Sequence, residues 1–157
     1  QTRTFFTGHE WALPPALADL ILRAAGRSGA ASSAGTIEFM DFMLMDEVTS
    51  EGTRVQVRGG LAWMDLESKR RYQKPFLEVT EPQRTAILDD IAWPARARPE
   101  FSHGVAFFNR FRDLVASGFW SSQVGIRDLQ YVGNVPVPTW NGCPPEALRK
   151  LGVSYDA

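Results

Sequence analysis

In this chain of 157 residues, the two histidines, His9 and His103, and the single cysteine, Cys143, are of the types most often used as general bases, metal ligands or nucleophiles. Glu10 follows His9, but no second histidine stands one helical turn later, so the zinc-protease pattern is missing. A metal site at either histidine would need Asp or Glu partners from elsewhere in the chain. His103 falls in the first turn of an expected helix, where a hydrogen-bonded structural role is favoured over that of a ligand or base.

Cys143 would be a thiol nucleophile if the fold placed it beside His103. The spacing of the pair is unspecific, and the prolines after Cys143 offer no feature that stabilises a thiolate. As a lone cysteine it also fits a small buried apolar side chain in a cytosolic protein, or an intermolecular bond or free thiol in an exported one. A stand-alone small enzyme using His103 and Cys143 is therefore kept as the alternative function.

Other catalytic patterns are missing. There is no G-x-S-x-G elbow, and the small-residue stretch 26–35 lacks both the Lys-Ser/Thr ending and the preceding strand of a phosphate-binding loop. The adjacent carboxylates of Asp89 and Asp90 point apart on a helix. The sequence thus predicts no catalytic, cofactor-binding or metal-binding residue in this chain. A sugar-binding module that uses tryptophans is a third interpretation.

Composition narrows the class of protein. The formal net charge is −1 and the pI is near 6.2, which argues against a general nucleic-acid binder. No apolar run approaches the ~20 residues of a membrane span. The opening residues 1–4 lack a basic region followed by an apolar one. We therefore expect either a cytosolic protein or a mature chain whose signal has been removed.

Hydrophobic periodicity and capping signals predict an all-α fold. Capping boxes of the type Thr-x-x-Glu/Gln begin at Thr7 and Thr80, and Gly118 is a natural helix stop. The expected helices cover about residues 8–24, 36–47, 53–71, 80–92 and 99–117, with a loop over 26–35 and a last helical turn over 145–150.

Two local features of these helices carry specific expectations. Thr36 is expected to cap the second helix, which buries Phe42 among its apolar residues. Gly59 and Gly60 sit inside the third helix, where each costs about 1 kcal/mol relative to alanine. We expect the close approach of another backbone to compensate for this loss of helix stability.

The C-terminal part of the chain, residues 118–157, is aromatic, proline-rich and poor in charge over 118–145. Disordered tails have the opposite composition, so its rings must be buried on this chain or on a partner. We predict a single all-α domain, residues 1–157. It consists of a helical body of about five helices over residues 5–117 and a long irregular, partner-binding arm over residues 118–157.

Six motifs resemble one protein family over nearly the whole chain, from Phe5 to Val153. They are, in order, FFTGHEWA, IEFMDFML, RGGLAWMD, LDDIAWP, HGVAFFNRFRDLVASGFW and YVGNVPVPTWNGCPP. Together they are similar to the gluconate 2-dehydrogenase subunit 3 family, and the last two motifs are the most specific.

This resemblance implies a non-catalytic small subunit of a periplasmic sugar or sugar-acid dehydrogenase. The implied partner is a flavoprotein of the glucose-methanol-choline group that holds FAD, with an iron–sulfur cluster in some complexes. A membrane-bound cytochrome c subunit with c-type haem often completes such complexes. Members usually carry a twin-arginine export signal and are thought to escort the folded flavoprotein, acting as a chaperone. At Cys143 the resemblance supports an inter-subunit disulfide, to be weighed against a buried free thiol.

On this basis we expect the partner contacts to come from aromatic residues and arginine, because aromatic and Arg side chains anchor many interfaces. We also expect contacts from the helix that contains Gly59 and Gly60. The expected contact residues are Arg58, Gly59, Trp63, Phe119, Trp120, Tyr131, Pro136, Pro138, Trp140 and Cys143.

Overall fold

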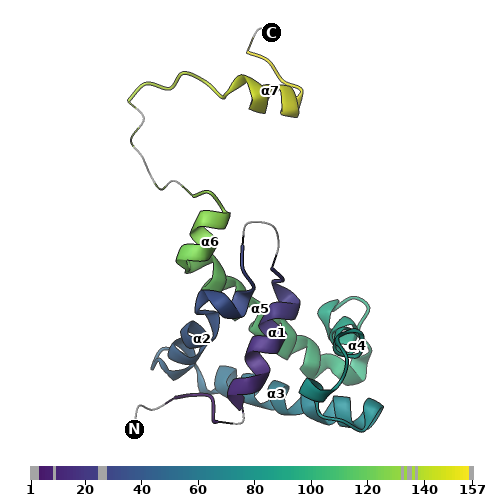
Figure 1. Cartoon of the computed structure of the whole chain (residues 1–157). Coiled ribbons are helices and arrows are strands. Elements are labelled where there is room, and N and C mark those ends of the chain that lie inside the picture. Colours follow the sequence, from purple (N-terminus) through teal and green to yellow (C-terminus); the bar gives the residue numbers. More distant parts are fainter. Residues whose placement is uncertain are drawn as a thin grey trace.

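The structure is a computed structural model that describes residues 4–8, 10–24, 28–131, 133, 136 and 138–155. The described residues form helices and no β-strand, which confirms the all-α class (Figure 1). They contain two more α-helices than the five expected. The α-helices are α1 (Leu13–Ile21), α2 (Thr36–Met45), α3 (Glu51–Tyr72), α4 (Glu81–Ala92), α5 (Ser102–Ser121), α6 (Gln123–Asp128) and α7 (Pro145–Leu151). Four 3₁₀ helices accompany them: η1 (Glu10–Ala12), η2 (Ala31–Ala34), η3 (Phe76–Glu78) and η4 (Pro99–Phe101).

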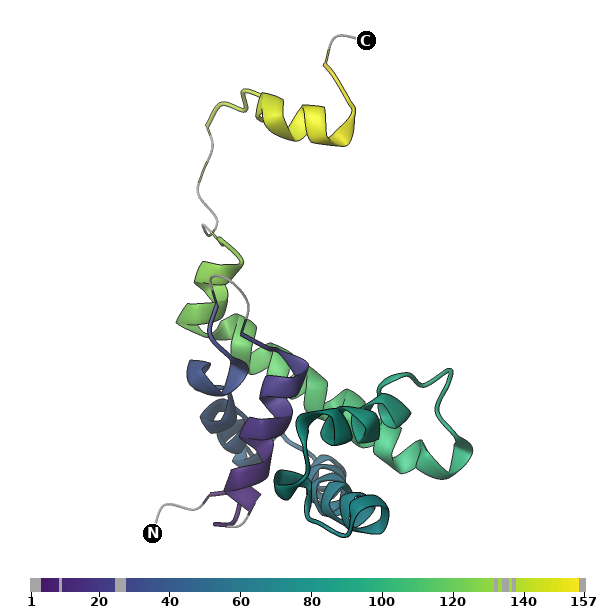
Figure 2. The same cartoon turned by 45° about the vertical axis from the view of Figure 1, so that its right-hand side comes forward.

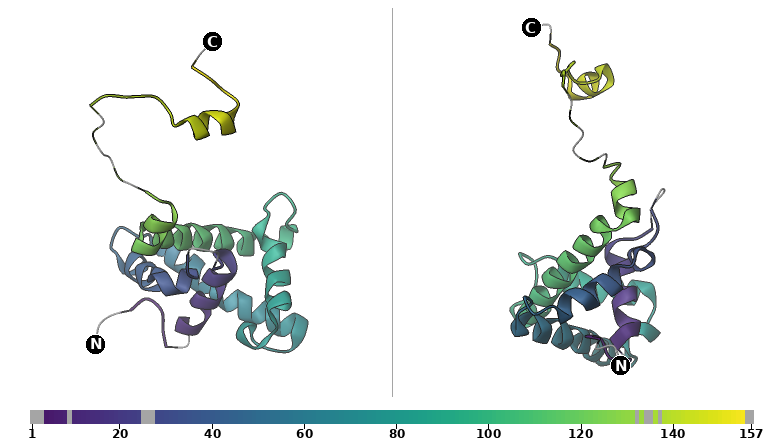
Figure 3. Two further views of the ribbon diagram at one scale, coloured as in Figure 1. Left: turned by 45° about the horizontal axis from the view of Figure 1, so that its top comes forward. Right: turned by 90° about the vertical axis from the view of Figure 1, so that its left-hand side faces the viewer.

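Helix α5 is the centre of the body. It contacts α1, α2, α3, α4 and α6, and Figure 3 shows it crossing the length of the body. Its buried face carries Phe107, Phe111, Val115 and Phe119, each four residues from the next. This spacing keeps the side chains on one side of the helix, where they form one core with apolar residues of the surrounding helices. Their fully buried partners include Phe5, Phe6, Phe76, Leu17, Met40, Leu44, Met64, Ile87 and Ile91.

One of the two hydrogen bonds of the capping box expected at Thr7 is present before the first helix. The Thr7 N–H donates to Glu10 Oε2 at 2.8 Å, and η1 precedes α1, whose first turn holds both prolines. The helix ends at Ile21, before the expected residue 24. Part of the expected loop is ordered by Asp19, whose carboxylate accepts from Ser32 N–H and Oγ, both at 2.8 Å. His9 and residues 25–27 lie outside the described residues.

The prediction for α2 was wrong in two details. Gly35, at φ +74°, precedes the helix, and Thr36 is fully buried without capping it. Phe42 is 67% exposed, because α2 buries Ile37, Met40 and Leu44 on its opposite side. The end of α2 is instead held by Arg54 of α3, which donates to the carbonyls of Leu44 and Asp46, both at 2.8 Å.

Gly118 does not end α5. A methyl group there would lie 2.9 Å from Phe39 Cδ1 and 3.1 Å from Thr36 Cγ2, so the glycine allows α2 to pack closely against α5. The helix continues to Ser121, and Ser122 then caps α6 by accepting from Gly125 N–H at 3.0 Å. The part expected to be irregular from residue 118 is therefore helical as far as Asp128.

Beyond α6, the chain leaves the body. Figures 1 and 2 show α7 lying apart from the other helices. It contains no buried residue, and it ends at Gly152, which takes the left-handed conformation (φ +67°). The expected last helical turn is thus confirmed as α7.

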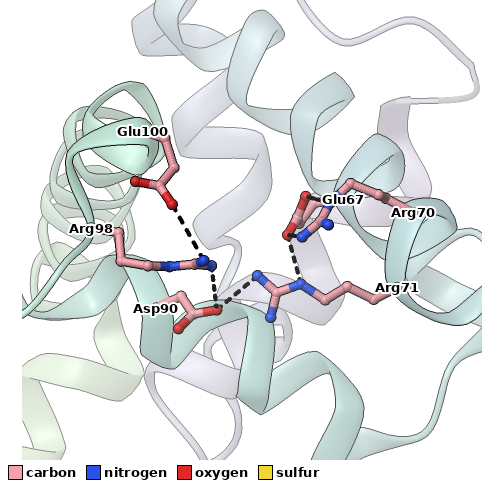
Figure 4. A network of polar contacts seen from close by, with 6 residues as sticks. All are labelled: Glu67, Arg70, Arg71, Asp90, Arg98 and Glu100. Carbon is pink, nitrogen blue, oxygen red and sulfur yellow. Dashed lines mark hydrogen bonds and ion pairs between the residues drawn. The ribbon is translucent and has the colours of Figure 1, made fainter.

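A network of ion pairs joins α3, α4 and the segment of Arg98 and Glu100 at η4 (Figure 4). Glu67, which is 5% exposed, accepts from Arg70 Nε at 2.8 Å and from Arg71 Nε at 2.6 Å. Arg71 Nη2 also lies 2.7 Å from Asp90 Oδ2 on α4. Hydrogen bonds from Arg70, opposed in part by burial and supported by Arg71, lower the pKa of Glu67 to about 2.

Candidate partner interface

The C-terminal segment, residues 138–155, exposes apolar side chains that its own chain does not cover. Trp140 is 70% exposed, and Leu151, Val153 and Tyr155 are exposed as well. Monomeric proteins rarely leave several large apolar side chains uncovered in so short a stretch. The segment therefore has the composition of a contact surface.

Within this segment, Tyr155 near the end of the chain contacts the backbone at Cys143. The Cys143 N–H donates to the Tyr155 hydroxyl oxygen at 2.8 Å. Gly142, at φ +85°, lies under the same ring, where a methyl group would come 2.8 Å from Tyr155 Cε2. Cys143 is a half-buried free thiol in this chain. Tyr155 thus fixes the backbone turn that carries the thiol.

The remaining arm residues divide into two groups. Tyr131, Pro136 and Pro138 are exposed, Tyr131 by 61%. Phe119 is 3% exposed and Trp120 half-buried; their rings meet edge to face at 4.8 Å between centroids, and both pack on the core. Phe119 is therefore a core residue of the body.

The outer face of α3, made of Val55, Gly59, Ala62 and Leu66, forms a second exposed apolar surface. Val55 is 62% exposed and Leu66 is 66% exposed, while Gly59 and Ala62 are also open to solvent. The four positions follow an i, i+4, i+7, i+11 spacing, so they lie in one line along the helix. A separate face of α3, including Val57, Leu61 and Met64, packs into the core.

Two hollows flank this outer face. The α3–α5 hollow, of about 370 Å³, includes Val55, Gly59, Trp63, His103 and Gly104 in its lining, and the lining carries no Asp, Glu, Lys or Arg among the described residues. The α1–α3 hollow, of about 420 Å³, lies on the other side. Its lining residues are Glu10, Leu13, Leu61, Ala62, Asp65, Pro75, Leu77 and Glu78.

Arg58 and Trp63, both expected to contact a partner, are partly engaged within the chain. Arg58 Nη2 donates to the Phe5 carbonyl at 2.6 Å, and its guanidinium lies 4.4 Å from the Phe5 ring centroid. Trp63 meets Phe101 edge to face at 5.7 Å and packs over Gly104. Arg58 therefore fastens the N-terminal residues to α3, and Trp63 forms a half-buried wall of the α3–α5 hollow.

The structure does not bring His103 and Cys143 together. His103 lies in the first turn of α5, whereas Cys143 lies two residues before the start of α7, and these two helices are far apart in every view (Figures 1 to 3). In the part of the chain that the structure describes, no three His, Cys, Asp or Glu side chains gather in a way that would hold a metal ion. Among the described residues, no helix combines the length and the apolar character needed to cross a membrane.

Sequence reasoning missed Val55, Ala62, Leu66 and Tyr155 as surface features. The signal for the first three was present, because α3 carries two apolar lines where a simple surface helix carries one. Tyr155 had no such signal, since its role depends on a turn that returns the chain to Cys143.

Comparison with known proteins defines the class to which this helical chain belongs. The family model described as Gluconate 2-dehydrogenase subunit 3 matches residues 8–139, which is most of the chain. The chain therefore belongs to the gluconate 2-dehydrogenase subunit 3 family, and it is a small subunit of a dehydrogenase complex. A search of curated proteins and a search of solved structures each gave no significant match.

Proposed function

We propose that this chain is the non-catalytic small subunit of a periplasmic, FAD-dependent sugar or sugar-acid dehydrogenase. Its role is to fold, stabilise and escort a flavoprotein of the glucose-methanol-choline group, including export by the twin-arginine route. FAD, and an iron–sulfur cluster where one is present, belong to that partner. A membrane-bound cytochrome c subunit takes the electrons onward through its c-type haem.

One observation carries the proposal beyond family membership. The C-terminal segment holds Tyr155 against Gly142 and Cys143 while leaving Tyr155 63% exposed and the nearby Trp140 70% exposed. Ordering a segment without burying it gives little stability to this chain alone. A partner surface that covers these rings supplies the missing burial.

The central test is copurification of the full-length, tagged chain from its native host. We expect a larger subunit with a flavin absorption spectrum and sugar or sugar-acid dehydrogenase activity, located in the periplasmic fraction. Cells lacking the small subunit should retain the flavoprotein in the cytoplasm or degrade it. Recovery of the chain alone, or with a protein free of flavin, would refute the proposal.

A matched pair of variants tests the C-terminal segment. Trp140→Ser should reduce recovery of the flavoprotein severalfold, because buried tryptophans are frequent anchors of interfaces. Trp93→Ser is the control, since Trp93 is 60% exposed but follows α4 on the body. Equal recovery with both variants would remove Trp140 from the interface.

Cys143 is proposed to form a disulfide with a cysteine of the flavoprotein. The two thiols lose two protons and two electrons to a periplasmic thiol oxidant as the S–S bond forms. The subunits should then migrate together on a non-reducing gel and separately after reduction, and Cys143→Ser should abolish the joint band. Separate migration of the native subunits without reductant would exclude the bond.

A further inference from the structure

Gly59 is a glycine that the fold of this chain does not require. A methyl group at Gly59 would meet no atom within 4 Å, whereas one at Gly60 would overlap the ring of Phe107. Gly60 is therefore explained by the packing of α5 on α3. Gly59 weakens the same helix and gains nothing within the chain. The physical use that remains for it is the close approach of a backbone from outside.

The surroundings of Gly59 have the shape that receives a helix. The outer face of α3 runs for about 16 Å from Val55 to Leu66 at 1.5 Å per residue. Ala62 lies at the edge of the α1–α3 hollow, and Val55 and Gly59 lie at the edge of the α3–α5 hollow. A helix lying along this line would place its small residues over Gly59 and its flanking side chains in the two hollows.

The charges of the two hollows differ. Glu10, Asp65 and Glu78 line the α1–α3 hollow, whose described lining residues include no lysine or arginine. Glu10 Oε1 lies 3.9 Å from Arg58 Nε, and Asp65 Oδ1 accepts from Phe76 N–H, so these two carboxylates are partly compensated. Glu78 is exposed at the rim. A complementary helix has Lys or Arg along this edge and apolar residues along the edge facing Trp63.

We propose that the outer face of α3 binds an amphipathic α-helix of the flavoprotein. The basic edge of that partner helix faces Glu10, Asp65 and Glu78. This inference rests on the proposed function and specifies the partner element that this surface binds. A second copy of α3 is less complementary than a basic helix, because the edge beside its outer face carries Asp65 together with Arg58 and Lys69 and is therefore of mixed charge.

Paired substitutions test the contact at Gly59 in the purified complex. Gly59→Leu should weaken reassociation of the full-length chain with its flavoprotein by at least about tenfold, because it fills the space needed by the incoming backbone. Ala86→Leu adds bulk at an exposed position of α4 and is the control, with no expected change. Gly59→Leu should leave the melting temperature of the free chain unchanged or higher, since leucine favours helices.

A charge series and a crosslink identify the occupant. Glu78→Lys should weaken the complex more than Glu78→Gln, whereas Glu38→Lys on α2 should not change it. A photoreactive residue at Leu66 should crosslink to a helical segment of the flavoprotein that carries Lys or Arg at i, i+3 or i+4 spacing. A crosslink to a second copy of this chain, or to a segment without basic residues, would overturn the inference.

The outcomes separate this inference from the proposed function. A stable flavoprotein complex whose affinity is the same with Gly59→Leu overturns the inference and leaves the proposed function intact. The lack of any flavoprotein complex with the wild-type chain overturns both.

Discussion

Arg71 Nη2 of α3 lies 2.7 Å from Asp90 Oδ2 of α4, while Arg71 Nε donates to the buried Glu67 at 2.6 Å (Figure 4). The Arg71 side chain is only 17% exposed, so one guanidinium compensates a buried carboxylate and joins two helices. Arg71 therefore adds an ionic link between α3 and α4 to the apolar packing of these two helices.

Replacing Arg71 by methionine should destabilise the chain by about 2–4 kcal/mol, because it leaves Glu67 buried with less compensation. Arg70→Met should cost less, because the Arg70 side chain is 62% exposed. Urea unfolding followed by circular dichroism measures both. Equal losses of unfolding free energy for the two variants would show that Arg71 contributes no more to stability than Arg70.

Acid should loosen this network in a defined window. The pKa of Glu67 is about 2 in the folded chain, lowered from 4.5 by hydrogen bonds from Arg70 and Arg71. The stabilisation is complete above pH 4.5 and is lost as the pH falls from 4.5 to 2. This stabilisation amounts to about 3 kcal/mol. The difference in unfolding free energy between wild type and Glu67→Gln should shrink across this window; a constant difference would argue against ionised Glu67 as its source.

The neighbouring glycines of α3 should respond oppositely to the same change. Gly60→Ala should destabilise the free chain by about 1–3 kcal/mol, because its methyl group overlaps Phe107. Gly59→Ala should stabilise it by up to about 1 kcal/mol, because the added methyl meets open space. Thermal melting of the two variants gives the signs directly, and a loss of stability in both would refute the distinction.

Asp41 holds the N-terminal residues on the body. Its buried carboxylate accepts from the Phe6 N–H at 2.9 Å. Asp41→Ala should cost about 1–3 kcal/mol, because the buried amide loses its partner. It should also speed hydrogen exchange at Phe6. Asp46→Ala, which frees only the exposed amide of Val48, is the control and should change global stability little.

Tyr155→Phe tests whether the C-terminal segment is ordered in the free chain. The variant keeps the ring over Gly142 and removes the oxygen that accepts from Cys143 N–H. Hydrogen exchange of the Cys143 amide should then become several times faster, because the amide opens to water more often. An unchanged exchange rate would show that this hydrogen bond does not hold the turn in solution.

Helix patterns in the sequence predicted the fold class and four of the five main helices to within a few residues. Thr80 and Gln83 form the expected capping box. Gly118 misled the prediction of the end of α5, because a glycine that permits close packing of two helices has the same sequence appearance as a helix stop. Only the position of Phe39 and Thr36 beside it distinguishes the two roles.

The contact surfaces were only partly predictable for a similar reason. Trp140 stands out by composition alone, and the structure leaves it exposed. Phe119 looked the same in the sequence and is a core residue, because α5 extends past Gly118 and carries it inward. Leu66 is an apolar residue of α3 that is 66% exposed. Leu66 is exposed because a different side of α3 faces α5. The packing of the Phe107 ring of α5 against Gly60 determines which side that is.

Residues 129–144 connect α6 to α7 and thereby tether the C-terminal segment to the body. A stretch of roughly 16 residues reaches at most about 55 Å when fully extended. Once either proposed surface binds the flavoprotein, the other is held near its target at an effective concentration on the order of millimolar. A weak contact at the outer face of α3 can then be long-lived in the complex, and a single proteolytic cut in the tether before Cys143 would release the helical body while leaving both surfaces chemically intact.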